Sequence, residues 1–208
     1  MIYLSLQYGR ALAAVMVVLF HFSAYHRLNH DFDPLLGFFD NGHVGVDFFF
    51  ILSGFVMVLA HRNELYSQDK SILKYFYKRF VRVYPVYWIH FFFIVFARVF
   101  ASFASGNERF IRDFEFYFLL KNFFLFPVLK NLVGPAWSLT YELYYYILFS
   151  LAFLIPRKAF FLVICVYLFC ILFQFFPMSG VVMSYYTVEF LLGVLGGYLL
   201  IFKPLEKN

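Results

Sequence analysis

The stretch VYPVYWIHFFFIVFARVFA occupies residues 83–101 and decides the class of fold. Its one Lys, Arg, Asp or Glu side chain is Arg98, near its end. A helix needs about 20 mostly apolar residues to cross the hydrocarbon core of a bilayer. We therefore interpret this stretch as a membrane-spanning helix.

The composition of the whole chain also indicates a membrane protein. Of its 208 residues, 63% are hydrophobic, 25% aromatic and 14% charged, and the mean hydropathy is +0.77. Soluble globular chains have roughly 45–50% apolar and about 25% charged residues. A water-soluble chain of this length could not bury so much apolar surface. The net charge is +5, and the Lys and Arg residues lie mainly between apolar runs and form no single basic face. We therefore predict no nucleic-acid partner.

Further apolar runs of similar length predict an all-α, polytopic transmembrane bundle in a single domain over 1–208. With 83–101 they make about six spans, the others being 11–26, 44–60, 136–155, 159–176 and 181–202. The stretch 114–129 is shorter and broken by Pro127, which favours a re-entrant or interfacial helix. This arrangement leaves most Lys and Arg residues on one side, and the positive-inside rule then places both termini in the cytoplasm.

Two ionisable residues of the first run, Arg10 and His21, are eleven positions apart. On a helix this spacing is three turns plus roughly 20°, with a rise of about 16–17 Å, so both lie on one face. Ionisable side chains within spans are costly and mark functional sites by default. The alternatives are a positive-inside anchor for Arg10 and a hydrogen bond to a neighbouring helix for His21.

Arg79 and Arg82 precede the 83–101 span on its cytoplasmic side, at positions i and i+3. Two guanidinium groups on one helical face suit the oxygens of phosphate groups. Positive-inside anchoring is an equally good explanation.

Carboxylates form the third group of candidates. Asp47 stands at the outer start of the 44–60 span, where it needs a basic partner or caps the helix. Glu142 falls about one turn inside the 136–155 span, where it could bind a hydroxylated acceptor or orient a base. For Glu189, in the last span, we favour a structural ion pair.

Two other patterns carry no functional prediction. Cys165 and Cys170 lie five apart in one apolar run, a spacing that fits neither a metal site nor a redox pair, and we predict no metal. His26 and Asp31 have the H-x4-D spacing of glycerolipid acyltransferases, but we place them in a polar external loop without a supporting motif.

Taken together, the order and spacing of the motifs resemble the acyltransferase-3 family of integral membrane acyltransferases over nearly the whole chain. The motifs are Arg10-x10-His21, GVDFFFILSGF at 45–55, RxxRxxP at 79–85, WSLTYE at 137–142 and EFLLG at 189–193. The resemblance implies transfer of an acyl group, expected to be acetyl from acetyl-CoA, to a hydroxyl of a carbohydrate or glycoconjugate acceptor. It also implies a multi-pass protein of the plasma (bacterial inner) membrane.

The resemblance further implies roles for particular residues. His21 would be the catalytic base, in buried apolar surroundings that favour a neutral imidazole. The other catalytic positions would be Arg10, Glu142 and Asp47. The CoA phosphates would be held by Arg79, Arg82 and Arg10.

Members of that family usually have more spans, so the resemblance implies that this chain lacks C-terminal helices. An oligomer or a partner protein would then supply them. The alternative interpretation is an inactive or truncated relative, or a fragment, that acts as a non-enzymatic membrane transport or assembly component. Its intramembrane His, Asp and Glu side chains would then form a proton or substrate path.

Overall fold

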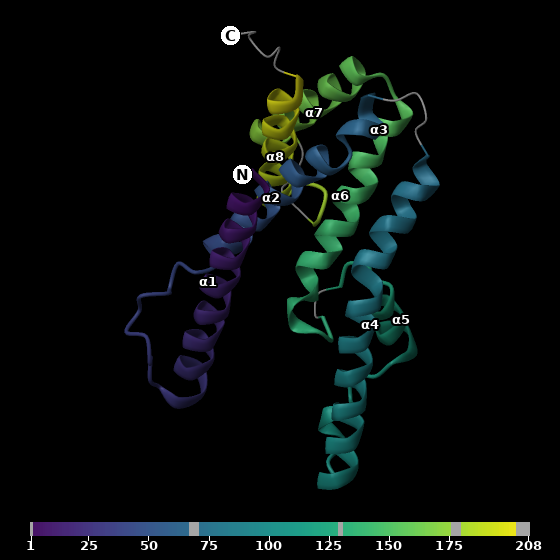
Figure 1. Cartoon of the computed structure of the whole chain (residues 1–208). Helices are drawn as coiled ribbons and strands as arrows, with labels where there is room; N and C mark the ends of the chain where they lie inside the picture. Colours follow the sequence, from purple (N-terminus) through teal and green to yellow (C-terminus); the bar gives the residue numbers. More distant parts are fainter. Residues whose placement is uncertain (1, 67–70, 129–130, 176–179, 203–208) are drawn as a thin grey trace. The chain divides into compact units, whose positions relative to one another are not determined.

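The computed structural model of the protein describes residues 2–66, 71–128, 131–175 and 180–202 (Figure 1). All regular secondary structure in these ranges is helical and none is strand, so the predicted all-α class is confirmed. The elements are α1 (Ile2–His30), α2 (Val44–Ala60), α3 (Arg62–Tyr66), α4 (Ile72–Ser105), η1 (Glu108–Phe110), α5 (Phe116–Phe123), η2 (Gly134–Ala136), α6 (Trp137–Leu154), α7 (Arg157–Leu172) and α8 (Tyr185–Phe202).

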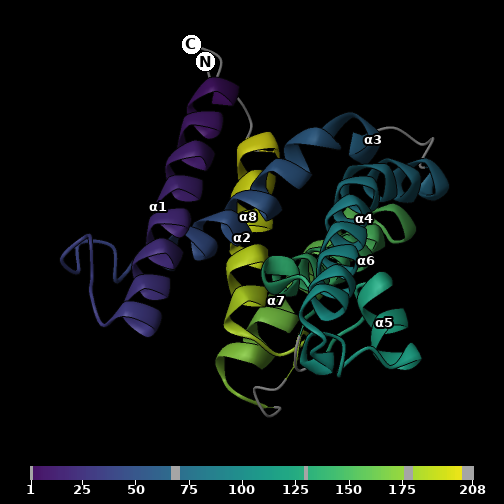
Figure 2. The ribbon, with the colours of Figure 1, turned by 90° about the horizontal axis from the view of Figure 1, so that it is seen from below.

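The helices form two compact units. One unit combines Met1–Tyr66 with Tyr185–Asn208 and contains α1, α2, α3 and α8. The other, Ser67–Ser184, contains α4 to α7. Helix α8 therefore packs against α2, from which it is distant in sequence (Figure 2). A single domain over 1–208 stays a prediction.

Each predicted span overlaps one helix, and two of these helices are long and apolar enough to cross a membrane. They are the stretch Leu4–His30 of α1 and the whole of α4. Helix α2 is apolar but has only 17 residues, about 25 Å at 1.5 Å per residue, against a hydrocarbon thickness of about 30 Å. The count of six spans stays a prediction, as does the re-entrant or interfacial placement of 114–129, where α5 has eight residues.

Helix α4 begins earlier than the predicted span, so Pro85 lies inside the helix and does not open it. The Ser71 side chain caps the first turn by accepting from the Lys74 backbone N–H at 3.3 Å. Gly106, with φ of +65°, ends the helix in the left-handed conformation that favours glycine. Arg79 and Arg82 are therefore part of this long helix, not of a separate approach to it.

In the first unit, α1 and α2 run antiparallel and touch at glycines. A Cβ built on Gly45 would lie 2.7 Å from the Ala13 carbonyl oxygen, and one on Gly9 would lie 3.0 Å from the Phe48 ring. Because α2 approaches Ala13 and then Gly9 as its own numbering rises, it begins beside the middle of α1 and not beside its end (Figure 1).

The contact between α2 and α8 is closer still. A Cβ on Gly193 would lie 1.9 Å from the Ile51 carbonyl oxygen, and one on Gly54 would lie 2.1 Å from the Phe190 carbonyl oxygen. The two backbones can approach this closely only because these positions lack side chains, as is common between membrane helices.

In the second unit, α4 and α6 pack antiparallel through aromatic rings. The Tyr75 ring lies 5.0 Å from that of Phe153 and 6.2 Å from that of Phe149, measured between centroids. Farther along α4, side-chain donors satisfy the last carbonyls of α5: the Trp88 indole N–H donates to Phe123 and the Tyr84 hydroxyl to Phe124, both at 3.1 Å.

The glycine contact predicts a position-specific loss of stability. Changing Gly193→Ala places a methyl group against the Ile51 carbonyl and forces α2 and α8 apart, so we expect the free energy of unfolding in detergent to fall by about 1–3 kcal/mol. Gly196→Ala is the matched control, since its Cβ would meet only a Phe55 ring carbon at 3.8 Å. Equal denaturation midpoints for the two variants would contradict this packing.

Candidate functional site

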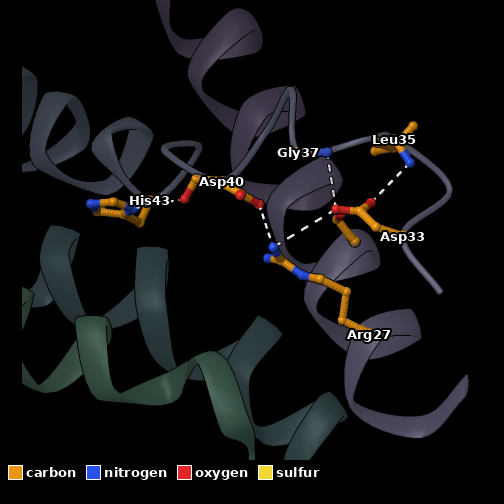
Figure 3. A network of polar contacts seen from close by, with 7 residues as sticks. Arg27, Asp33, Leu35, Gly37, Asp40 and His43 are labelled. Atoms are coloured by element: carbon orange, nitrogen blue, oxygen red, sulfur yellow. Dashed lines mark hydrogen bonds and ion pairs between the residues drawn. The ribbon is translucent and has the colours of Figure 1, made fainter. Parts of the chain in front are cut away.

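The loop after α1 is held against the C-terminal half of that helix by a polar network (Figure 3). Arg27 Nη1 lies 2.6 Å from Asp40 Oδ1 and 3.7 Å from Asp33 Oδ2. Asp33 also accepts from the Ser23 hydroxyl, which is fully buried, and from the backbone N–H groups of Leu35 and Gly37 at 2.9 and 3.0 Å. These hydrogen bonds, the one from Ser23 first, and the Arg27 charge hold the pKa of the Asp33 carboxyl below its ordinary value.

The loop held by this network returns along α1, so that its last residues lie beside Phe20 and His21. At the loop's end, His43 Nδ1 lies 3.3 Å from the Asp40 carbonyl oxygen, and its ring lies 5.7 Å from that of Phe20. The Phe20 ring in turn lies 5.3 Å from that of His21. The sequence predicts buried surroundings for His21, whereas the structure leaves this residue exposed on the surface of α1.

Helix α1 is continuous from Arg10 to His21, so the two residues share one face as the spacing predicts. The Phe48 ring contacts Gly9. Asp47 and Arg10 are therefore the sequence neighbours of two residues that touch. Asp47 lies in the first turn of α2, where the N-cap position belongs to His43, and a capping role for Asp47 is therefore wrong.

The carboxyl group of Asp47 interacts electrostatically with that of Glu189 on α8. The Glu189 Oε2 atom is buried and has no hydrogen-bond partner among the residues that the structure describes. We expected an ion pair for Glu189, but the neighbour that the structure identifies is an acid. The close glycine contact between α2 and α8 brings these two acidic side chains into the same part of the first unit.

The second unit holds a cluster around the Arg79 side chain. Its Cζ atom lies 5.6 Å from the centre of the Tyr75 ring and 5.3 Å from that of the Tyr146 ring. The Tyr75 hydroxyl donates to the Tyr146 carbonyl oxygen at 2.9 Å, and the Tyr146 hydroxyl donates to Glu142 Oε1. We name Tyr75, Arg79, Glu142 and Tyr146 the α4–α6 cluster.

The α4–α6 cluster corrects two expectations. From the sequence, the arginines belonged to the cytoplasmic end of one span and Glu142 to the outer end of the next. In the structure α4 and α6 overlap so that Tyr146 contacts both Arg79 and Glu142. Nor are the arginines equivalent, since Arg79 is buried with 9% of its surface exposed while Arg82 is exposed.

Tyr75 and Tyr146 are the cluster residues that the sequence interpretation missed. Tyr75 precedes Arg79 by four positions, and Tyr146 follows Glu142 by four. Side chains at this spacing are neighbours on a helix, so the pattern was visible.

The candidate residues are thus divided between the two units. Arg10, His21 and Asp47 belong to the first unit, and Arg79, Arg82 and Glu142 to the second. In the described ranges, no group of three or more His, Cys, Asp or Glu side chains is arranged to hold a metal ion.

Comparison with known proteins gives one match. The acyltransferase-3 family model, described as an acyltransferase domain, matches residues 3–204. No curated protein and no solved structure matches the chain.

The loop network predicts a defined response to substitution. In Asp33→Asn the amide offers one acceptor oxygen where the carboxylate offers two, and the ion pair with Arg27 is lost. We expect hydrogen exchange of the loop amides, measured over 31–43 and corrected for intrinsic rates, to rise about tenfold or more. Asp31→Asn, which removes a charge from the same loop, is the control.

The same network predicts a pH dependence. Because the folded-state pKa of Asp33 is lowered, its contribution to loop order is present above the ordinary pKa of 3.8 and is lost as the pH falls through the folded value. Loop protection that is insensitive to acid in the wild type, or unchanged in Asp33→Asn, would contradict the network.

Proposed function

The chain belongs to the acyltransferase-3 family of membrane acyltransferases, and from this premise we propose that it transfers an acyl group from acyl-CoA to a hydroxyl of a carbohydrate or glycoconjugate. Acetyl is the proposed acyl group. The proposed setting is the plasma (bacterial inner) membrane, with both termini in the cytoplasm and the acceptor handled at the outer face.

The observation that carries the donor half of this proposal is the α4–α6 cluster with the neighbouring Arg82. Arg82 supplies an exposed guanidinium one turn from the buried Arg79, and guanidinium groups bind phosphate oxygens through paired N–H donors. CoA carries several phosphates, so it is a natural ligand for this site. That Arg10 of the first unit also contacts CoA stays a prediction from the family resemblance.

The acceptor half of the proposal rests on His21. Its exposed imidazole would take the proton from the acceptor hydroxyl as the oxygen attacks the thioester carbonyl. Collapse of the tetrahedral intermediate would break the carbon–sulfur bond and release CoA, with the proton returning to the thiolate. The products are the acyl ester and free CoA.

The carboxylates would assist this step. Glu142, held by the Tyr146 hydroxyl, is suited to binding a hydroxyl of the acceptor. Asp47, whose sequence neighbour Phe48 contacts Gly9, is the remaining proposed catalytic residue.

The assay that tests the proposal measures acetyl transfer or acetyl-CoA hydrolysis by the purified protein in lipid. We expect His21→Ala to lower kcat by about 10²- to 10⁴-fold, because general base catalysis contributes that much. His26→Ala is the matched control on the same helix, since His26 contacts only aromatic rings among its described interactions, those of Phe22, Tyr25 and His30. Undiminished turnover in His21→Ala would exclude the general base role.

A protein that neither binds acetyl-CoA nor turns it over would contradict the proposed enzyme and favour a non-enzymatic relative. Binding in the wild type that is weakened in Arg82→Ala would support the donor site even where the acceptor is unknown. Mass spectrometry of envelope glycans with and without the protein would identify the acceptor.

A further inference from the structure

The two arginines of the RxxR motif have different surroundings, which suggests that they do different work. Arg79 is buried between the Tyr75 and Tyr146 rings, each only 2% exposed. A cation between two aromatic faces is stabilised by the negative potential of the rings, more strongly where water is excluded. The guanidinium and the two rings therefore hold one another in place.

The Tyr146 side chain passes this order on to Glu142. Its backbone carbonyl accepts from the Tyr75 hydroxyl, its ring contacts Arg79, and its hydroxyl donates to Glu142 Oε1. A hydrogen bond from a buried hydroxyl restricts the orientation of the carboxylate that accepts it. Glu142 is thus oriented through Tyr146.

Arg82, unlike Arg79, is not buried. Its side chain is exposed, although it lies one turn from Arg79 and its charge acts on Tyr146. An exposed guanidinium with an adjustable side chain can contact an incoming anion, whereas the Arg79 guanidinium is already enclosed by two rings.

We propose that Arg82 contacts a phosphate of the acyl-CoA donor, while Arg79 is a positioning residue that orients Glu142 through Tyr146. This inference rests on the proposed function and assigns separate roles within its donor site. It also adds Tyr146 to the residues on which turnover depends.

Two donors separate the roles. Acetyl-CoA carries the nucleotide phosphates, and acetyl-pantetheine lacks them while keeping the same thioester. We expect Arg82→Ala to raise KM for acetyl-CoA about 10- to 100-fold, the loss of one charge-assisted hydrogen bond, and to leave KM for acetyl-pantetheine unchanged. The preference for acetyl-CoA therefore shrinks by that factor.

Tyr146→Phe keeps the ring over Arg79 but removes the hydroxyl that holds Glu142. We expect kcat to fall about tenfold with both donors while the preference for acetyl-CoA is retained. For Arg79→Lys, which keeps a cation between the rings, we also expect a lower kcat with both donors and a retained preference for acetyl-CoA. Tyr144→Phe is the matched control on α6, because its hydroxyl contacts that of Tyr167 at 2.8 Å and should not affect turnover.

The outcomes separate this inference from the proposed function. An active wild type in which Tyr146→Phe equals Tyr144→Phe, or in which Arg79→Lys loses the donor preference and Arg82→Ala keeps it, would overturn the inference alone. A wild type that neither binds nor turns over acetyl-CoA would overturn both. Arg98→Ala, at the other end of α4, controls for loss of positive charge and should leave both KM values unchanged.

Discussion

The arginine enclosed between α4 and α6 is the constraint on which the proposed donor site depends. A guanidinium taken out of water loses its hydration, and that cost must be offset by new interactions. The two tyrosine rings supply part of the compensation, and the Tyr75 hydroxyl locks Tyr146 in place by donating to its carbonyl. Once Tyr146 is fixed, the orientation of Glu142 follows. The orientation of Glu142 therefore depends on how α4 and α6 pack.

In the first unit, glycines allow two helices to pack closely. Without side chains at Gly54 and Gly193, the α2 and α8 backbones come within contact distance, and this approach brings Asp47 near Glu189. The polar loop after α1 is held to that helix by the ion pairs of Arg27 with Asp33 and Asp40. Apolar helices thus carry a few polar groups at positions fixed by backbone contact.

Much of this could be predicted from the sequence, because hydrophobic length and helical spacing are local properties. The helices, the shared face of Arg10 and His21, and the family all follow from such patterns. The neighbour of Glu189 and the meeting of Arg79 with Glu142 could not be predicted, since both depend on how far one helix slides along another. That register is set by particular contacts, such as the Tyr75 ring against Phe149, which no single segment reveals. The exposure of His21 likewise depends on which helices cover α1.

The central claim is that this membrane protein binds acyl-CoA through its nucleotide phosphates. Calorimetric titration of the purified protein in lipid nanodiscs with acetyl-CoA, in the absence and presence of adenosine 3′,5′-bisphosphate, tests the claim most directly. The account predicts saturable binding that the bisphosphate competes away. No binding, or binding that the bisphosphate leaves unchanged, would contradict it.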